Sequence, residues 1–445
     1  MKQEIQLSDH FGYKRLVRFT MPSIFMMIVV SIYGVIDGFF ISNFVGKTPF
    51  SAVNFIMPFL MVVGALGFMF GAGGSALIAK TMGEGDDKKA NEIFSLITYI
   101  TIISGIIISV ISIVFLRSIA SFLGAEGSML EDAVTYGRII LIALPLLMVQ
   151  YAYGSFVIAA EKPKLGLIVS IMAGITNFIG DALFIAVLKW GVTGAALATA
   201  VGQAVGGIIP LVYFSRNNPS RLRLVKCKWD GKAFLKTCTN GSSELISNIS
   251  MSVVGMLYNV QLLKYAGENG IAAYGTIMYV NFIFISVFLG YSVGVSPLIS
   301  YHFGACNHDE LKGLLKKSFV MIISASVLMF VIAKYMAMPL SKIYVGYDKE
   351  LFEMTTRAFV IYAYSFLFAG FASFGSAFFT ALNNGAISAT ISFLRTLVFE
   401  IASVLLLPLI WGLDGIWVSI IVAEFMAVVV TVIFLITNRK KYKYL

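Results

Sequence analysis

Long apolar segments, separated by short polar ones, run through the whole chain. Their continuous apolarity, with glycine and proline interspersed, is typical of helices, and the alternating pattern of a membrane barrel is absent from the sequence. About 20 apolar residues at 1.5 Å each cross the ~30 Å hydrocarbon core of a bilayer. The pattern predicts twelve spans, at residues 17–44, 50–79, 93–116, 133–158, 166–188, 192–214, 238–263, 271–301, 318–338, 358–382, 387–410 and 415–437.

The composition agrees with this pattern. Hydrophobic residues make up 58% of the chain, charged residues 13%, and the mean hydropathy is +0.88, which is too apolar for a soluble globule. We therefore expect an all-α polytopic membrane protein. The three cysteines (Cys227, Cys238 and Cys306) show no C-x-x-C spacing and the three histidines form no ligand set, so neither disulfides nor a metal or other cofactor is expected.

The net charge of +10 comes from lysine and arginine residues that flank the predicted spans, so it indicates orientation and not a nucleic-acid partner. Counted by side, 23 of them lie on the side of the chain's two ends, nine on the other side, and Arg395 lies inside a span. The positive-inside rule places both termini in the cytosol of a plasma-membrane protein. Residues 215–237 form the longest polar stretch; they could bind anionic lipid headgroups, but a plain cytosolic anchor is the simpler interpretation.

The two halves of the chain are related by one offset of 221 residues. Ser75–Gly83 (S-A-L-I-A-K-T-M-G) recurs as Ser296–Gly304 (S-P-L-I-S-Y-H-F-G), and the same offset fits from the first span to the sixth. Six spans return the chain to the same side, so the halves are parallel repeats, as in many transporters. We expect an N-terminal lobe (1–214), a cytosolic linker (215–237) and a C-terminal lobe (238–445), with a cleft between the lobes.

The halves differ in their polar residues. The N-terminal half has a set of polar residues whose partners in the repeat are apolar or neutral: Asp37 corresponds to Tyr258, Asn177 to Val398, Asp181 to Ala402 and Thr199 to Ile420. A polar set that occurs in only one half is hard to explain by a structural role, because both halves share the same fold. It predicts a functional site in the N-terminal half.

The predicted depths of these residues agree. Asp37 lies nine residues before Gly46 at the outer end of the first span, roughly 13 Å deep at 1.5 Å per residue. The predicted depth of Asp181 and Thr199 is about 12 Å by the same rise per residue. Asn177 lies one turn from Asp181 on the same helix face. Two carboxylates in low dielectric cannot both stay ionised cheaply, so the set suits a proton relay. The same oxygens also suit a hard cation such as sodium.

For other polar residues inside the predicted spans, a structural role is the simpler interpretation. Arg395 and Glu424 are expected to pair as a structural ion pair, and Glu400 has no obvious partner. Glu244 could attract cationic solutes, but we favour a charge that offsets the dipole at a helix start. Side chains turned toward the cleft would form an adaptable pocket, for which the candidates are Tyr33, Tyr136 and Met26.

Taken together, the motifs resemble the MATE multidrug and toxin extruders over essentially the whole chain. The motifs are the P-x14-D of Pro22 and Asp37, the N-x-x-x-D of Asn177 and Asp181, Thr199 in A-L-A-T-A-x-G-Q, the S-P-L-I-S-Y-x-F-G-A at the end of the eighth span and the G-x-D-G-x-W of the last. The resemblance implies a V-shaped fold of twelve helices in two pseudo-symmetric six-helix lobes.

The resemblance also implies roles for individual residues. In the DinF-like branch of the family, residues that match Asp37, Asn177, Asp181 and Thr199 form a cation site in the N-terminal lobe, and a proline that matches Pro22 bends helix 1 when the aspartate is protonated. A proline near a helix start can equally be harmless. The other main branch places an acid midway along helix 7. Residues 247–259 contain none, so a C-terminal cation site is not expected.

We therefore expect a monomeric secondary active exporter that expels organic cations or amphipathic drugs in exchange for protons or sodium. A flippase for lipid-linked oligosaccharide is the alternative, and it should show a cleft rich in arginine and lysine, for which only Arg138 and Arg395 are candidates. An enzyme would need a nucleophile with its base, or metal ligands, inside the spans, and the sequence shows neither H-E-x-x-H nor G-x-S-x-G. A channel would not need the difference between the halves. The sequence leaves the substrate and the coupling ion open.

Overall fold

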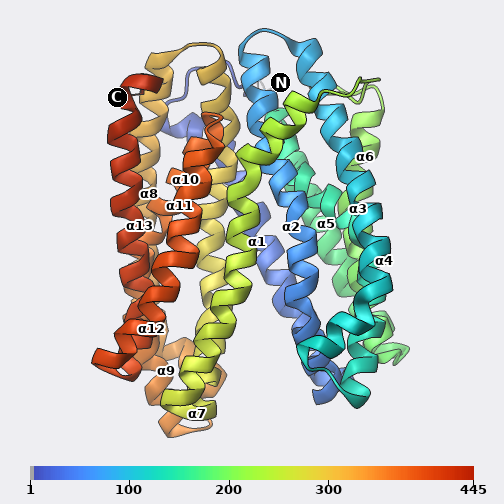
Figure 1. Ribbon diagram of the computed structural model, residues 1–445, viewed down its shortest axis with the longest axis vertical. Coiled ribbons are helices and arrows are strands. Elements are labelled where there is room, and N and C mark those ends of the chain that lie inside the picture. Colours follow the sequence, from blue (N-terminus) through green and yellow to red (C-terminus); the bar gives the residue numbers. More distant parts are fainter. Residues whose placement is uncertain (1–4, 445) are drawn as a thin grey trace.

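The computed structural model describes residues 5–444, apart from the side chains of Val35, Ser42 and Lys47. Helices joined by short turns make up nearly all of it, and two groups of helices lie side by side (Figure 1). The group coloured blue to green comes from the first half of the chain, and the group coloured yellow to red comes from the second. The two groups diverge toward one end, which gives the molecule a V shape.

Six helices form the first half, and two of them end in a π-helical segment. These elements are α1 (Tyr13–Phe40) with η1 (Ile41–Val45), α2 (Lys47–Gly83), α3 (Asp87–Leu123), α4 (Gly127–Ala159), α5 (Pro163–Gly180) with η2 (Asp181–Val187), and α6 (Gly191–Ser215).

The second half begins with α7 (Gly231–Gly304), which is interrupted at Gly267 by a non-helical backbone (φ 62°, ψ −151°) and therefore supplies two spans. Glycine adopts this positive φ without the steric cost that a Cβ would add. The remaining elements are α8 (His308–Val345), α9 (Lys349–Tyr362), η3 (Ala363–Ser365), α10 (Phe366–Ala381), α11 (Gly385–Phe393), η4 (Leu394–Phe399), α12 (Glu400–Trp411) and α13 (Leu413–Tyr442).

The twelve predicted spans are confirmed. Eleven continuous helices among the described residues are long and apolar enough to cross a membrane, and α7 counts twice because of its break. Most of the helices extend several residues beyond the predicted spans, because polar turns of helix continue past the apolar part.

The linker is shorter than the sequence predicts. Helix α7 starts at Gly231, inside the predicted range 215–237, because the Asp230 carboxylate caps it by accepting hydrogen bonds from the backbone N–H of Lys232 and Ala233. The expected dipole role of Glu244 is therefore wrong, since this residue lies more than three turns after the helix start.

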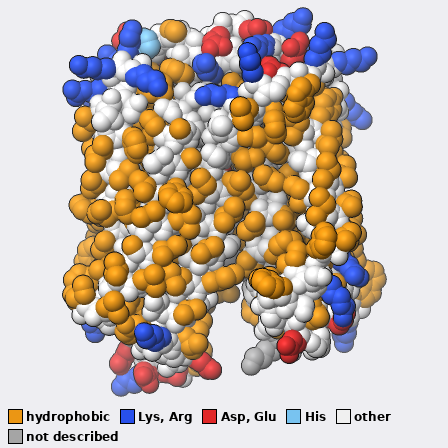
Figure 2. Space-filling model, in the orientation of Figure 1, with side chains coloured by type: hydrophobic (Ala, Val, Ile, Leu, Met, Phe, Trp, Pro, Cys, Tyr) orange, Lys and Arg blue, Asp and Glu red, His pale blue; other side chains and the backbone are white. Residues whose placement is uncertain are grey.

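Charge separates the surface into bands. In the face shown in Figure 2, a broad hydrophobic band lies between two charged ends, and lysine and arginine side chains gather most densely at the upper end. Both termini lie at that same end (Figure 1). At the opposite end a deep notch separates the two halves (Figure 2).

The halves meet at the end with the termini, where α2 packs along α7. Glycines allow this approach in a two-fold pattern that follows the sequence repeat. A Cβ on Gly83 would overlap the carbonyl oxygen of Tyr301, and a Cβ on Gly304 would overlap that of Lys80, where 80 pairs with 301 and 83 with 304 in the repeat. The backbones therefore touch directly, and any side chain here must separate the helices.

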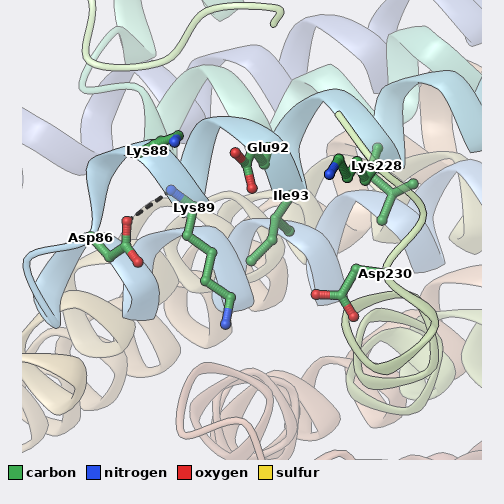
Figure 3. A pocket seen from close by; sticks show the side chains of 8 residues that line it. Asp86, Lys88, Lys89, Glu92, Ile93, Lys228 and Asp230 are labelled. Carbon is green, nitrogen blue, oxygen red and sulfur yellow. Dashed lines mark hydrogen bonds between the residues drawn. The ribbon is translucent and has the colours of Figure 1, made fainter. Parts of the chain in front are cut away.

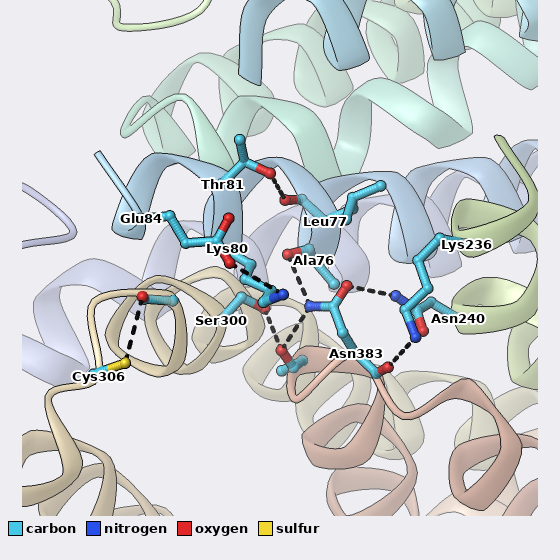
Figure 4. A network of polar contacts seen from close by, with 12 residues as sticks. Ala76, Leu77, Lys80, Thr81, Glu84, Lys236, Asn240, Ser300, Cys306 and Asn383 are labelled. Carbon is cyan, nitrogen blue, oxygen red and sulfur yellow. Dashed lines mark hydrogen bonds and ion pairs between the residues drawn. The ribbon is translucent and has the colours of Figure 1, made fainter. Parts of the chain in front are cut away.

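Hydrogen bonds also connect α2 with the second half (Figure 4). The Asn383 side chain donates to the Ala76 carbonyl (3.3 Å) and accepts from the Asn240 amide (2.7 Å), while the Lys236 ammonium donates to the Asn383 carbonyl (2.6 Å). Three elements distant in sequence are thus joined by hydrogen bonds at the end where the V is closed.

The chain's first described segment also crosses between the halves. The Leu7 N–H donates to Glu161 in the α4–α5 turn (2.8 Å), and the Phe11 N–H donates to Glu310 at the start of α8 (2.9 Å). The side chains of Leu7 and Phe11 are fully buried. This segment therefore connects a turn of the first half to a helix of the second.

The glycine contact leads to a stability prediction. Gly83→Ala forces α2 away from α7, and overpacking of this kind costs about 1–3 kcal/mol, so we expect a lower unfolding temperature of the purified protein. The control is Gly275→Ala in α7, where a Cβ would meet nothing within 4 Å and the helix should gain about 0.5–1 kcal/mol. Equal unfolding temperatures for Gly83→Ala and the unchanged protein would show that the contact does not hold the halves together.

Candidate functional site

Asp37 lies in the last turn of α1, and Thr199 lies in α6. The Thr199 hydroxyl donates a hydrogen bond to the Asp37 carboxylate (Oγ1 to Oδ1, 3.2 Å), and both side chains are buried, at 6% and 8% exposure. A carboxylate at this depth is costly unless it has a partner or faces a cavity. One hydrogen bond satisfies only part of its capacity, so further ligands fit here.

Asn177 and Asp181 lie where α5 passes into the π-helical segment η2. Both are buried, and neither the Asn177 amide nor the Asp181 carboxylate has a hydrogen-bond partner among the described side chains and backbone. Asn177 faces Asp37 without reaching hydrogen-bond geometry, and Asp181 lies within electrostatic range of Asp37. Buried polar atoms without partners cost about 1–3 kcal/mol each, so this group of atoms is suited to a bound proton, cation or water.

Two tyrosines border the same group. Tyr136 in α4 is fully buried, its hydroxyl has no hydrogen-bond partner in the described part of the chain, and it lies within electrostatic range of both Asp37 and Asp181. Tyr33, one turn before Asp37 on α1, is half-buried and also interacts with that carboxylate. Both hydroxyls can donate a hydrogen bond to an ionised carboxylate or accept one from a protonated one.

Small residues on α6 bring this helix against α5. A Cβ on Gly202 would lie 3.0 Å from the Asn177 Cβ, and one on Gly194 would lie 2.9 Å from the Phe184 carbonyl oxygen. Gly180 similarly meets Ala198. This is the small-residue packing of membrane helices, and it places Thr199 beside the end of α5.

The other residues predicted on helix 1 lie farther from this group. Met26 is buried, and the end of its side chain lies next to Gly154 of α4 and Gly166 of α5. It therefore packs among α1, α4 and α5, about three helical turns from Asp37. Pro22 lies inside α1, nine residues after the helix start at Tyr13 and not at the helix start itself. The neighbouring backbone of Ser23 and Ile24 contacts Gly290 of α7.

Arg395 and Glu424 lie in the second half and form a bidentate ion pair. The Arg395 Nε and Nη2 atoms donate to the Glu424 carboxylate at 2.7–3.0 Å, and Nη1 donates to the Ser373 hydroxyl at 3.0 Å. Glu424 is only 4% exposed, so the pair satisfies a carboxylate that would otherwise be buried with its charge unmatched.

The structure also shows two pockets that the sequence does not predict. One, of about 230 Å³, lies among Asp86, Lys88, Lys89, Glu92, Lys228 and Asp230, where three positive and three negative side chains surround the same space (Figure 3). Its lining therefore carries no excess of either charge. None of the predicted site residues lines it.

The other pocket, of about 300 Å³, is almost wholly apolar. It lies between α1, α7 and α8 and includes Ile36, the residue next to Asp37. Periodicity alone did not show that these apolar faces converge, because lipid-facing and cleft-facing residues are equally apolar. Its lining is Ile32, Ile36, Tyr279, Val280, Ile283, Phe284, Ile332, Met336, Leu340 and Tyr344.

Twelve spans in two repeated halves, with buried carboxylates in the membrane interior, define a membrane transporter. The MatE family model matches residues 22–183 and 245–406, once in each half. The chain belongs to this family, whose members are transporters and not enzymes.

Known proteins of this kind cover nearly all of the chain. It is 31% identical over 318 residues to the multidrug export protein MepA of Staphylococcus haemolyticus (strain JCSC1435), covering 71% of this chain and 69% of that one. It is 26% identical over 417 residues to MepA of Staphylococcus aureus (strain MSSA476), covering 93% and 91%. A solved multidrug resistance MATE family transporter in an outward-facing conformation superposes with a TM-score of 0.93 at 20% identity, covering 100% and 99%, and this likeness shows the shared fold.

The ion pair of the second half gives a testable prediction. Arg395→Met leaves Glu424 buried without its partner, and we expect a loss of about 3–5 kcal/mol in stability, measured by thermal unfolding of the purified protein. The double variant Arg395→Met/Glu424→Gln should recover part of this loss, because Glu424 then carries no unmatched charge.

The matched control is Arg117→Met, which breaks the exposed Arg117–Glu131 pair and should change stability little. If Arg395→Met is as stable as Arg117→Met, the buried pair has no structural role.

Proposed function

We propose that this chain is a secondary active multidrug exporter of the plasma membrane, which expels organic cations and amphipathic drugs in exchange for protons or sodium ions. The observation that carries the proposal is the buried group in the first half: Asp37 bound to Thr199, with the unpartnered polar atoms of Asn177 and Asp181 beside it. The names of the MepA relatives support export of drugs.

The buried group supplies the coupling step. A cation or proton bound between Asp37 and Asp181 offsets the repulsion of two carboxylates in low dielectric, so its arrival and departure change the local energy strongly. The set offers carboxylate, amide and hydroxyl oxygens, which fit sodium as well as a proton. In this proposal the ion is transported cargo and not a resident metal.

The shape of the molecule supports an outward-open state. The halves touch through Gly83 and Gly304 at the end with both termini and are separated by a notch at the other (Figure 2). With the termini in the cytosol, as the positive-inside rule indicates, the notch faces outward. Transport then requires the α2–α7 contact to separate while the opposite end closes.

The apolar pocket beside α1 suits the drugs of this proposal. A cavity lined by Ile36, Phe284, Met336 and similar side chains accepts varied apolar groups, because methionine and aromatic side chains adapt their packing. Flippase activity on a pyrophosphate-linked lipid finds little support. Arg395 is neutralised by Glu424, and Arg138 is exposed.

The first test of this proposal is Asp37→Asn. The amide keeps the shape but cannot exchange a proton or carry charge, so we expect coupled export to fall to the background rate while expression and unfolding temperature stay normal. Ethidium transport in proteoliposomes, driven first by a pH gradient and then by a sodium gradient, measures this and identifies the ion. Asp132→Asn, at the start of α4, is the matched control. Ethidium export at the full rate by Asp37→Asn would contradict the proposal.

The second test concerns Pro22. Proline removes a backbone hydrogen bond inside α1, and this weak point lies beside the Ser23–Gly290 contact between the halves. We infer that ion binding at Asp37 alters the bend of α1 here, because a weakened helix can have two shapes separated by only a few kcal/mol.

Pro22→Ala should therefore transport more slowly than the unchanged protein and with an altered pH dependence, measured in the same proteoliposomes. Pro22→Gly keeps a weak point in the helix and should retain more activity. A wild-type rate and pH profile for Pro22→Ala would remove the bend from the cycle.

A further inference from the structure

A second carboxylate lies in a corresponding place in the other half. Glu400 begins α12 immediately after the π-helical segment η4, as Asp181 begins the π-helical segment η2 in the first half. The repeat offset pairs Asp181 with Ala402, only two residues from Glu400. π-Helical segments inside membrane helices often accompany functional sites. Each half therefore carries an acid beside a π segment in the corresponding span.

The residue that pairs with Asp37 in the repeat is Tyr258, and it faces this second acid. Tyr258 is 2% exposed, its hydroxyl has no hydrogen-bond partner within the described residues, and it lies within electrostatic range of Glu400. Tyr274 stacks on Tyr258 with ring centroids 5.0 Å apart and planes 7° apart. Tyr362, at the end of α9, also lies within range of Glu400. Three tyrosines thus lie within electrostatic range of one carboxylate.

Glu400 has no direct partner for its carboxylate among the described residues. It forms no hydrogen bond or ion pair with the described side chains, whereas the nearby Arg395 directs its donors at Glu424 and Ser373. Glu244 is another carboxylate within range of Arg395. Three acids therefore lie within electrostatic range of one guanidinium, which forms a direct ion pair only with Glu424 among the described residues.

The ligand that fits is an organic cation. A hard metal ion takes about six or more oxygen ligands, and one free carboxylate with tyrosine rings does not supply them. A bulky cation with delocalised charge is held by a single carboxylate together with the faces of aromatic rings, where each cation–π contact adds to the affinity. Tyr258 adds a hydroxyl that has no hydrogen-bond partner among the described residues.

We propose that Glu400, with Tyr258, Tyr274 and Tyr362, binds the cationic group of the exported drug in the second half of the molecule. This rests on the proposed function and deepens it: the coupling ion binds in the first half, and the positive charge of the substrate binds in the second.

The experiment measures equilibrium binding to the purified full-length protein in lipid nanodiscs. The probes are tetraphenylphosphonium, a delocalised organic cation, and triphenylphosphine oxide, an uncharged molecule of similar shape. Glu400→Gln removes the charge and keeps the size, so we expect tetraphenylphosphonium to bind about 10-fold more weakly or worse and triphenylphosphine oxide to bind as before. Glu400→Asp, which retains the charge, should lose less.

Tyr274→Leu keeps the carboxylate and removes one half-buried ring, so it tests the same pocket if Glu400→Gln does not fold. It should weaken tetraphenylphosphonium binding several-fold, roughly the value of one cation–π contact. Unchanged tetraphenylphosphonium affinity in either folded variant, or equal losses for both probes, overturns the assignment.

The outcomes also separate this inference from the proposed function. If the unchanged protein binds and exports tetraphenylphosphonium and Glu400→Gln does the same, only the second-half site fails. If the unchanged protein neither binds nor exports the cation, the substrate class of the proposed function fails, and this site fails with it. Loss of ion-coupled export in Asp37→Asn, with tetraphenylphosphonium binding retained, supports the separation of the two sites.

Discussion

The direct backbone contact between α2 and α7 is the constraint on which the arrangement of the two halves depends. Gly83 and Gly304 each lie against a carbonyl oxygen of the opposite half, in positions related by the 221-residue repeat. Without a hydrophobic force between helices in lipid, close packing and hydrogen bonds must hold membrane helices together. The contacts of Asn383, Asn240 and Lys236 supply such hydrogen bonds at the same end. In the proposed transport cycle this contact separates while the opposite end closes.

The two halves differ in how their buried carboxylates are paired. In the second half, Glu424 is satisfied by Arg395 in a bidentate pair, which is a structural solution. In the first half, the Asp37 carboxylate has one hydroxyl donor, and the polar atoms of Asp181 and Asn177 have no partner among the described residues. Incomplete satisfaction of this kind is costly in a folded protein. It persists where a bound ion or substrate completes the site, and the cost then becomes part of the binding energy.

The repeat connects these observations. Parallel repeats give each half the same helices, so a residue in one half has a structural counterpart in the other. In the repeat, Asp37 corresponds to Tyr258, and Glu400 lies two residues before Ala402, the counterpart of Asp181. The same scaffold thus offers two acidic positions of different chemistry, one beside amide and hydroxyl groups and the other within electrostatic range of three tyrosines. In the proposed function, this divergence of the halves separates the site of the ion from the site of the organic cation.

The sequence by itself determined the number of spans, their approximate positions and the internal repeat, because a helix is the structure that satisfies its own backbone hydrogen bonds in lipid and its length is set by the bilayer. It also singled out Asp37, Asn177, Asp181 and Thr199 as the polar set of one half. Only the tertiary structure shows the features that depend on how the helices rotate and pair. Thr199 donates a hydrogen bond to Asp37, Tyr258 lies within electrostatic range of Glu400, and Met26 packs away from the polar group. The structure also shows that α7 starts inside the predicted linker. A uniformly apolar helix carries no periodic signal for the face it turns to lipid, to a neighbour or to a cleft, so only packing fixes that choice.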